Sequence, residues 1–226
     1  MNAIPSGAQT PAVRISRRVS LSHSAAAMAV TVMLWGSPIA MAADPSGPAV
    51  PIEQLDAALL SAMKAGQATP FAQRYAMLAP AVERAVDLNV LLREAVGLSW
   101  SGLQANQKTA LASTFHRYTI SNYTANFDSY DGQSFRVLPQ TRALPDGDVI
   151  VQTQIVRRDK SPVEIDYVMR QAPAGWKAVD LLSDGTVSQV AVQRSDFSPL
   201  HASGGARALE AGLRQKVANL SNGALA

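Results

Sequence analysis

The chain has 226 residues, with 20 lysines and arginines against 17 aspartates and glutamates, and its lack of cysteine excludes disulfides and cysteine-ligated metal centres. Only His116 and His201 follow the N-terminal leader described next, so a multi-histidine metal site is excluded as well. The leader contains Arg14, Arg17 and Arg18, which account for the whole net charge of +3, so the charge does not support nucleic-acid binding.

Residues 1–42 have the order of a cleavable signal peptide. Three arginines precede an apolar run over 25–35, a helix-breaking Gly-Ser-Pro follows, and a stretch of small residues ends at Ala42. The run is about half as long as the roughly 20 residues that a membrane-spanning helix needs, so cleavage is favoured over anchoring. We predict cleavage near Ala42 and export by the general secretory route, which is favoured over the twin-arginine route that residues 16–21 partly match.

The rest of the chain has the length of one domain and can bury a core without disulfides. Residues 43–50 are predicted to be a linker, residues 51–220 a single domain, and residues 221–226 a tail. Pro80 is expected to break or restart the second helix, because proline lacks the amide donor, and Asp87 is placed to cap the third. Apolar residues at helical spacing predict helices over 52–63, 71–86, 88–96 and 104–126.

After Gly132 the pattern changes from helical spacing to alternation, which indicates strands over 134–138, 148–157, 163–170 and 176–182. A last helix is predicted over 204–220. In the second and third strands one face is apolar, with Val149, Val151, Thr153, Ile155, Val163, Ile165, Tyr167 and Met169. We therefore expect an α+β fold, with several N-terminal helices packed on one face of an antiparallel sheet of four or more strands and a closing C-terminal helix.

Few residues have the partners that catalysis needs, and no P-loop, nucleophile elbow or dinucleotide-binding glycine motif occurs. His116 lies inside the long helix without a neighbouring carboxylate or nucleophile, so we expect a packed or surface role for it. His201 lies in a loop of serine and glycine and receives no role.

Two aspartates on predicted strands could act as buried bases. Asp166 alternates with Glu164 and Arg170, which predicts a solvent-facing position. Asp180 is in phase with the apolar Trp176, Ala178 and Leu182, so we expect it to be half-buried and paired with a partner.

Aromatic residues gather towards the end of the long predicted helix. They are Phe115, Tyr118, Tyr123, Phe127 and Tyr130. Such residues form core in most proteins, but they could also line a tunnel for an apolar chain. Composition alone leaves both interpretations open.

Across residues 51–220, a series of short motifs in a fixed order resembles the pattern of a known protein family. They are Val96-Gly97 with Trp100, Phe115 with Tyr118 and Tyr123, Tyr130-Asp131-Gly132, and the segments 162–167, 175–180, 184–188, 193–197 and 204–205. Together they resemble the MlaC-type, or toluene-tolerance, family of periplasmic lipid-binding proteins. Within that family the chain is similar to the hopanoid-associated branch labelled HpnM.

The resemblance implies a non-enzymatic periplasmic carrier without a cofactor or metal. It implies that the apolar part of a phospholipid or hopanoid-type lipid lies in a cavity between helices and sheet. It also implies a monomer that exchanges lipid with inner- or outer-membrane transport proteins, while the cargo itself stays open. The candidate wall residues are Val96, Phe115, Phe127, Val151, Ile155, Ile165, Tyr167 and Val179.

Two alternatives belong to other classes of protein. A cone-shaped enzyme of the ketosteroid-isomerase kind would pair Asp180 with Tyr167 or Tyr118 as base and oxyanion donor. A periplasmic adaptor would have a filled core and no pocket of several hundred Å³. Extraction of bound lipid from the purified protein separates the three.

Overall fold

The computed structural model describes residues 46–225, and the predicted signal peptide over 1–42 lies outside the described residues. The described residues belong to one unit of the chain, 42–226. Residues 46–49 form turns, and the first helix begins at Val50, the last residue of the predicted linker.

Helices form the first half of the described chain, as the apolar spacing predicts. Gly66, with a φ of 65°, directly follows the first helix, and the Asp87 side chain accepts a hydrogen bond from the Val90 amide at the start of the third, which confirms the predicted cap. The bounds are α1 (Val50–Ala65), α2 (Phe71–Ala85), α3 (Leu88–Val96), the short 3-10 helix η1 (Gly97–Trp100) and α4 (Ala105–Asn126).

The expected break at Pro80 is wrong, because α2 continues through it. Pro80 lies on the exposed side of the helix, and so does Ala76, whose carbonyl loses its amide partner. Proline inside a helix costs about 3 kcal/mol. Burial of Leu78 and Val82 on the opposite side offsets this cost, since each contributes about 1.5–3 kcal/mol.

The strands form one five-stranded antiparallel sheet in the order β1-β2-β3-β4-β5. The predicted α+β class and the antiparallel sheet are confirmed. The two-residue β5 was not predicted, and β1 and β3 are longer than the alternation suggests. The bounds are β1 (Ser134–Ala143), β2 (Val149–Arg157), β3 (Lys160–Ala172), β4 (Gly175–Ser183) and β5 (Val187–Ser188).

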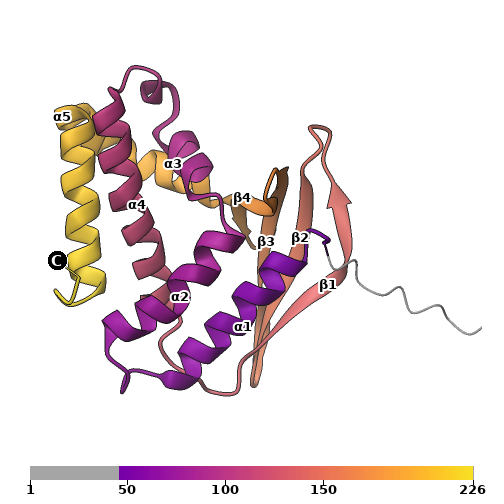
Figure 1. The fold of residues 1–226 in the computed structure, drawn as a ribbon. Helices are drawn as coiled ribbons and strands as arrows, with labels where there is room; N and C mark the ends of the chain where they lie inside the picture. Colours follow the sequence, from indigo (N-terminus) through magenta and orange to yellow (C-terminus); the bar gives the residue numbers. More distant parts are fainter. Residues whose placement is uncertain (1–45, 226) are drawn as a thin grey trace, which may run out of the picture. The chain divides into compact units, whose positions relative to one another are not determined.

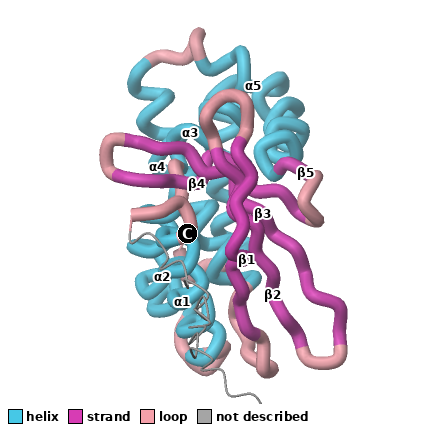
Figure 2. The backbone as a smooth tube through the Cα atoms, turned by 90° about the vertical axis from the view of Figure 1, so that its right-hand side faces the viewer, coloured by secondary structure: helices cyan, strands magenta, loops and turns pink. Residues whose placement is uncertain are grey.

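One face of the sheet, called the inner face below, packs against the helices. Val151 pairs with Tyr167, which pairs with Leu181 on the next strand, so these three side chains share that face. Val151 and Met169 are fully buried there. Figure 1 shows the helices on one side of the sheet, and Figure 2 shows the sheet from its other side.

The last helix, α5 (Gln189–Leu220), has a sharp bend at Gly204 and Gly205. Gly205 has φ 64° and ψ −151°, a conformation that is essentially restricted to glycine. The predicted closing helix is therefore only the second arm of α5. The first arm leads from the sheet edge to the helices, and Phe197 in this arm is buried.

Candidate functional site

A mostly apolar pocket of about 240 Å³, called the inner pocket below, lies between the inner face of the sheet and the helices. Its lining residues come from strands β3 and β4, from helices α3, α4 and α5, and from the segments that flank them. Figure 1 shows where these elements lie. The lining residues are Val86, Leu91, Thr119, Asn122, Tyr123, Asn126, Phe127, Ile165, Tyr167, Leu181, Ser183, Gln189 and Gln193.

The periodicities of β3 and α4 explain why these residues face the pocket. Ile165 and Tyr167 are two positions apart on β3, so both side chains lie on the inner face. Phe127 directly follows α4, four positions after Tyr123 in the last turn of that helix, and the two rings stack with centroids 6.1 Å apart. The Phe127 ring also contacts Phe135 of β1 at 6.0 Å, which closes that side of the pocket.

The two pocket tyrosines are buried polar groups in an apolar region. Burial raises the pKa of Tyr123 and that of Tyr167, and the charge of Asp56 raises both further. The two hydroxyls also interact with each other, which lowers the pKa of Tyr123 and raises that of Tyr167. The pocket therefore contains a pair of polar atoms within a mostly apolar wall.

Asp56 lies on the buried side of α1 and is only 7% exposed. Burial, and secondarily the nearby Glu53 carboxylate, raises the pKa of Asp56 from 3.8 to about 7. Its Oδ2 atom has no hydrogen-bond partner among the described residues. Sequence reasoning missed it, although position 56 follows Ile52 by four residues and precedes Leu59 by three, on the apolar face of the helix.

A second hollow, called the α1–β1 groove below, has a volume of about 340 Å³. Its lining residues are Glu53, Asp56, Ala57, Leu60, Ser134, Phe135 and Val137. Phe135 lines this groove, and its ring packs on Phe127, which lines the inner pocket. The two aromatic rings therefore separate the groove from the inner pocket.

Three of the predicted wall residues, Phe127, Ile165 and Tyr167, line the inner pocket together. Val151 is the strand partner of Tyr167, and it is fully buried in the core. Ile155 is half-buried and pairs with Phe135, further along the same face.

The other three predicted wall residues lie elsewhere. Phe115 is fully buried, with its ring 6.2 Å from that of Phe197. Val96 lines a separate hollow of about 200 Å³, together with Phe197 and His201. Val179 is buried in β4, at a bulge opposite Val168 and Met169 of β3.

Asp180 has a structural role at the start of α5. Its carboxylate accepts hydrogen bonds from the Ser188 hydroxyl at 2.5 Å, from the Val190 amide at 3.1 Å and from its own neighbour's amide, that of Leu181, at 2.8 Å. The expectation of a half-buried, partnered carboxylate is thus confirmed. Asp180 shares a face with Leu182, as expected, but the expected face shared with Trp176 and Ala178 is wrong, because the bulge at Val179 turns Asp180 to the opposite side of the sheet.

The isomerase-like pair is consequently not formed with Tyr167. Asp180 pairs with Val168, so it lies on the outer face, whereas Tyr167 lies on the inner face. Tyr118, the other candidate, packs against Phe115 and has Lys216 over its ring. Neither tyrosine shares a pocket with Asp180, which removes the geometric basis of that alternative.

The expected solvent-facing position of Asp166 is wrong as well. Asp166 is only 5% exposed, and burial raises the pKa of its carboxyl. The turn at Gly185 covers it, since a side chain there would come within 3.6 Å of the Asp166 Oδ2 atom. Its strand neighbours Glu164 and Arg170 are exposed as expected.

His116 is half-buried, as expected for a packed residue. Burial lowers the pKa of its imidazole, against the opposing charges of Glu83 and Asp87. Over residues 46–225, no group of three or more histidine, aspartate or glutamate side chains is arranged to hold a metal ion. In the same range, no helix is both long and apolar enough to cross a membrane.

An antiparallel sheet with helices over one face and an apolar pocket between the two layers defines an α+β ligand-binding domain. The chain belongs to the MlaC family, because the family model described as MlaC protein matches residues 53–215. The resemblance seen in the motifs is confirmed at this level.

Among solved structures, the chain is similar to the phospholipid-binding protein from Ralstonia solanacearum, which was solved in complex with a phospholipid. The TM-score is 0.66 at 20% sequence identity, and the match covers 77% of this chain and 98% of that chain. At this identity the match shows a common fold. The comparison with curated proteins found no match.

Proposed function

We propose that this protein is a non-enzymatic periplasmic carrier that holds the apolar part of a lipid between the sheet and the helices. The observation that carries the proposal is the mostly apolar inner pocket in a chain with the MlaC fold. The phospholipid bound by the Ralstonia solanacearum protein supports it. Burial of lipid tails is favourable by about 25 cal/mol per Å² of apolar surface, which suits such a pocket.

The inner pocket must widen to accept a lipid. Its volume of about 240 Å³ lies below the range of about 300–1,000 Å³ that is usual for pockets of drug-sized ligands. The α1–β1 groove lies just beyond the contact between Phe127 and Phe135. Displacement of these rings would join the two hollows, and we propose this as the route by which lipid tails reach the interior.

The location, partners and cargo are further parts of the proposal. The predicted signal peptide would direct the protein to the periplasm, where it would exchange lipid with inner- or outer-membrane transport proteins as a monomer. On the basis of the sequence motifs, we propose that the protein belongs to the HpnM branch and that its cargo is a hopanoid. A phospholipid is the alternative cargo within the same proposal.

Two adjacent leucines of β4 provide a matched test. Leu181 lines the inner pocket, whereas Leu182 pairs with Asp166 on the outer face, and both are half-buried. We expect L181W to lower lipid occupancy several-fold, because the indole fills the pocket, and L182W to leave it unchanged. Native mass spectrometry and lipid extraction of protein purified from its own periplasm measure the occupancy.

Circular dichroism of both leucine variants checks that they are folded. Equal occupancy in the two variants would show that the lipid does not lie in the inner pocket. Absence of any lipid from the unmodified protein would contradict the carrier function itself.

A further inference from the structure

Asp56 is an acidic residue in the middle of an apolar helix face. The same side of α1 buries Ile52, Leu55 and Leu59, each of which is at most 1% exposed. Asp56 is nearly as inaccessible, at 7%. A carboxylate in this setting is costly unless a donor or a cation reaches it.

No partner within the described residues meets this requirement. Asp56 Oδ2 accepts no hydrogen bond there, and the charged group that acts most on the carboxyl is the like-charged Glu53. The contrast with Asp148 is informative, because that buried carboxylate receives two hydrogen bonds from Arg170, at 2.9 and 2.6 Å. Asp56 Oδ2 is therefore a buried acceptor that lacks a donor among the described residues, and a ligand can supply one.

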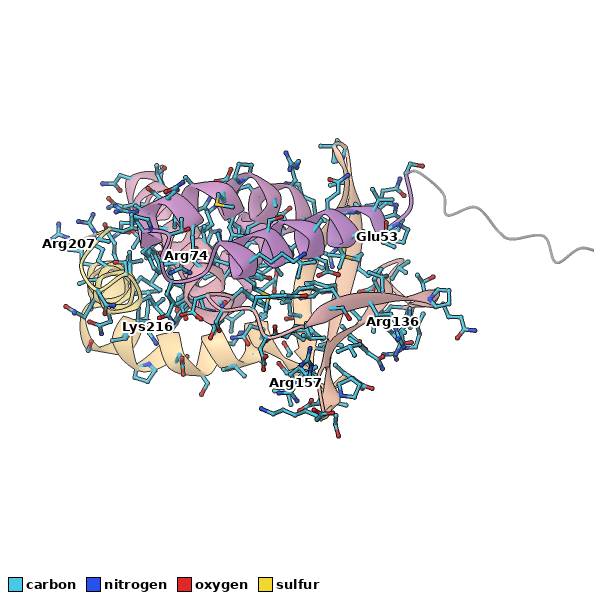
Figure 3. The ribbon with its side chains drawn as sticks, turned by 90° about the horizontal axis from the view of Figure 1, so that it is seen from below. Glu53, Arg74, Arg136, Arg157, Arg207 and Lys216 are labelled. Atoms are coloured by element: carbon cyan, nitrogen blue, oxygen red, sulfur yellow. The ribbon has the colours of Figure 1, made fainter. Side chains whose placement is uncertain are left out.

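The α1–β1 groove is the hollow from which such a donor can reach Asp56. Asp56 and Glu53 contribute acceptors to its wall, while Leu60, Phe135 and Val137 contribute apolar surface. Its volume of about 340 Å³ falls within the range of ligand pockets. Figure 3 shows Glu53 on α1 beside β1, the strand that carries Arg136.

The charges at the groove decide which polar group it can take. Arg136 alternates with Phe135 and Val137 along β1, so its side chain lies on the other face of the strand and does not neutralise the groove. Two carboxylates repel a phosphate, whereas they accept hydrogen bonds from a hydroxyl or an ammonium group.

We infer that the α1–β1 groove binds a hydroxyl or amine group carried by the lipid cargo, with Asp56 as the acceptor, and that it excludes phosphate. This inference rests on the proposed carrier function and adds the chemical class of the cargo. A phosphate-bearing headgroup then remains outside the groove, and only a hydroxyl or amine enters it alongside the apolar chain.

The test compares three ligands with the same apolar chain: 1-decanol, decylamine and decyl phosphate. Isothermal titration calorimetry at pH 8, below the concentrations at which micelles form, measures each affinity for the purified protein. We expect the alcohol and the amine to bind at least tenfold more tightly than the phosphate, as hydrogen bonds to a charged group allow. D56L should remove this preference and retain binding of the apolar chain.

Two further variants complete the design. D56N keeps the size of the side chain and should reduce the preference for decylamine by removing the charge. E164Q removes an exposed charge from the outer face of β3, outside the groove, and we expect it to leave the preference unchanged. Thermal denaturation followed by circular dichroism verifies that each variant is folded.

The outcomes distinguish the inference about Asp56 from the proposed carrier function. If the unmodified protein binds all three ligands equally, or if D56L keeps the preference, the inference about Asp56 is overturned while lipid binding stands. If no decyl ligand binds to any variant, the carrier function itself fails.

Discussion

At the residue scale, the ionisation of Asp56 links folding stability to pH. The folded protein holds the Asp56 proton more tightly than the unfolded chain, because burial raises the pKa from 3.8 to about 7. The other titratable groups around it are Glu53 on α1, Tyr123 on α4 and Tyr167 on β3. Asp56 therefore contributes most to stability below pH 3.8, and this contribution is lost as the pH rises through about 7.

We predict that D56N stabilises the ligand-free protein in a pH-dependent way. At pH 8 the raised pKa of the Asp56 carboxyl, about 7 instead of 3.8, corresponds to a cost of roughly 4 kcal/mol, which the amide avoids. At pH 4 both side chains are neutral in the folded state, so the difference in the free energy of unfolding should be small. Urea denaturation at the two pH values measures it, and an equal effect at both would contradict the raised pKa.

At the element scale, the start of α5 depends on the Asp180 carboxylate. It accepts hydrogen bonds from Ser188 and Val190, and so ties the end of β4 to β5 and to the helix. We predict that D180A lowers the free energy of unfolding by about 1–3 kcal/mol, because the donors lose their acceptor. Thermal unfolding should show a decrease in Tm of several degrees.

Asp196 supplies the control for D180A. It lies on the exposed side of α5 and forms an ion pair with Lys216 at 3.7 Å. An exposed pair contributes only about 0–1 kcal/mol, so D196A should change the Tm by much less. If the two variants are equally stable, the role assigned to Asp180 is wrong.

The sequence predicted α1 to α4, the second arm of α5 and the four long strands, because each is encoded by its own periodicity. It missed the first arm of α5, and His201, which was expected in a loop, lies in that arm. It did not predict the orientation of Asp180, since the bulge at Val179 arises from the pairing of β4 with β3 and is invisible in the alternation of β4 alone. The burial of Asp166 depends on the turn at Gly185, which lies 19 positions further along the chain. Such effects of distant segments need the folded chain.

For the candidate site, too, local periodicity predicts some features, whereas the packing of distant segments determines others. Alternation along β3 places Ile165 and Tyr167 on one face, and both line the inner pocket. The sequence could not show which apolar residues border a hollow and which, like Phe115, are enclosed by close packing. Asp56 was visible as a charge within an apolar stripe, but its lack of a partner is a property of the three-dimensional arrangement.

At the scale of the whole molecule, the proposed cleavage after residue 42 would remove Arg14, Arg17 and Arg18 and leave 17 basic against 17 acidic residues. A net charge near zero does not keep copies apart, so the state of assembly depends on the surfaces that could pair. We predict a monomer, because both edges of the sheet are poorly suited to pair with another strand, and size-exclusion chromatography with light scattering measures this. A stable dimer at micromolar concentration would contradict the prediction.

The sheet has two free edges, and both are poor templates for another strand. At one edge, the ladder between β1 and β2 is interrupted between Val137 and Thr141, where Pro139 has no amide to donate. At the other, β5 has only two residues, and the adjoining part of β4 is bridged at Ala178 by the Val86–Asp87 segment. In the proposed carrier function, lipid exchange would open the apolar interior, and neighbouring copies would then find little backbone to pair with, which limits aggregation.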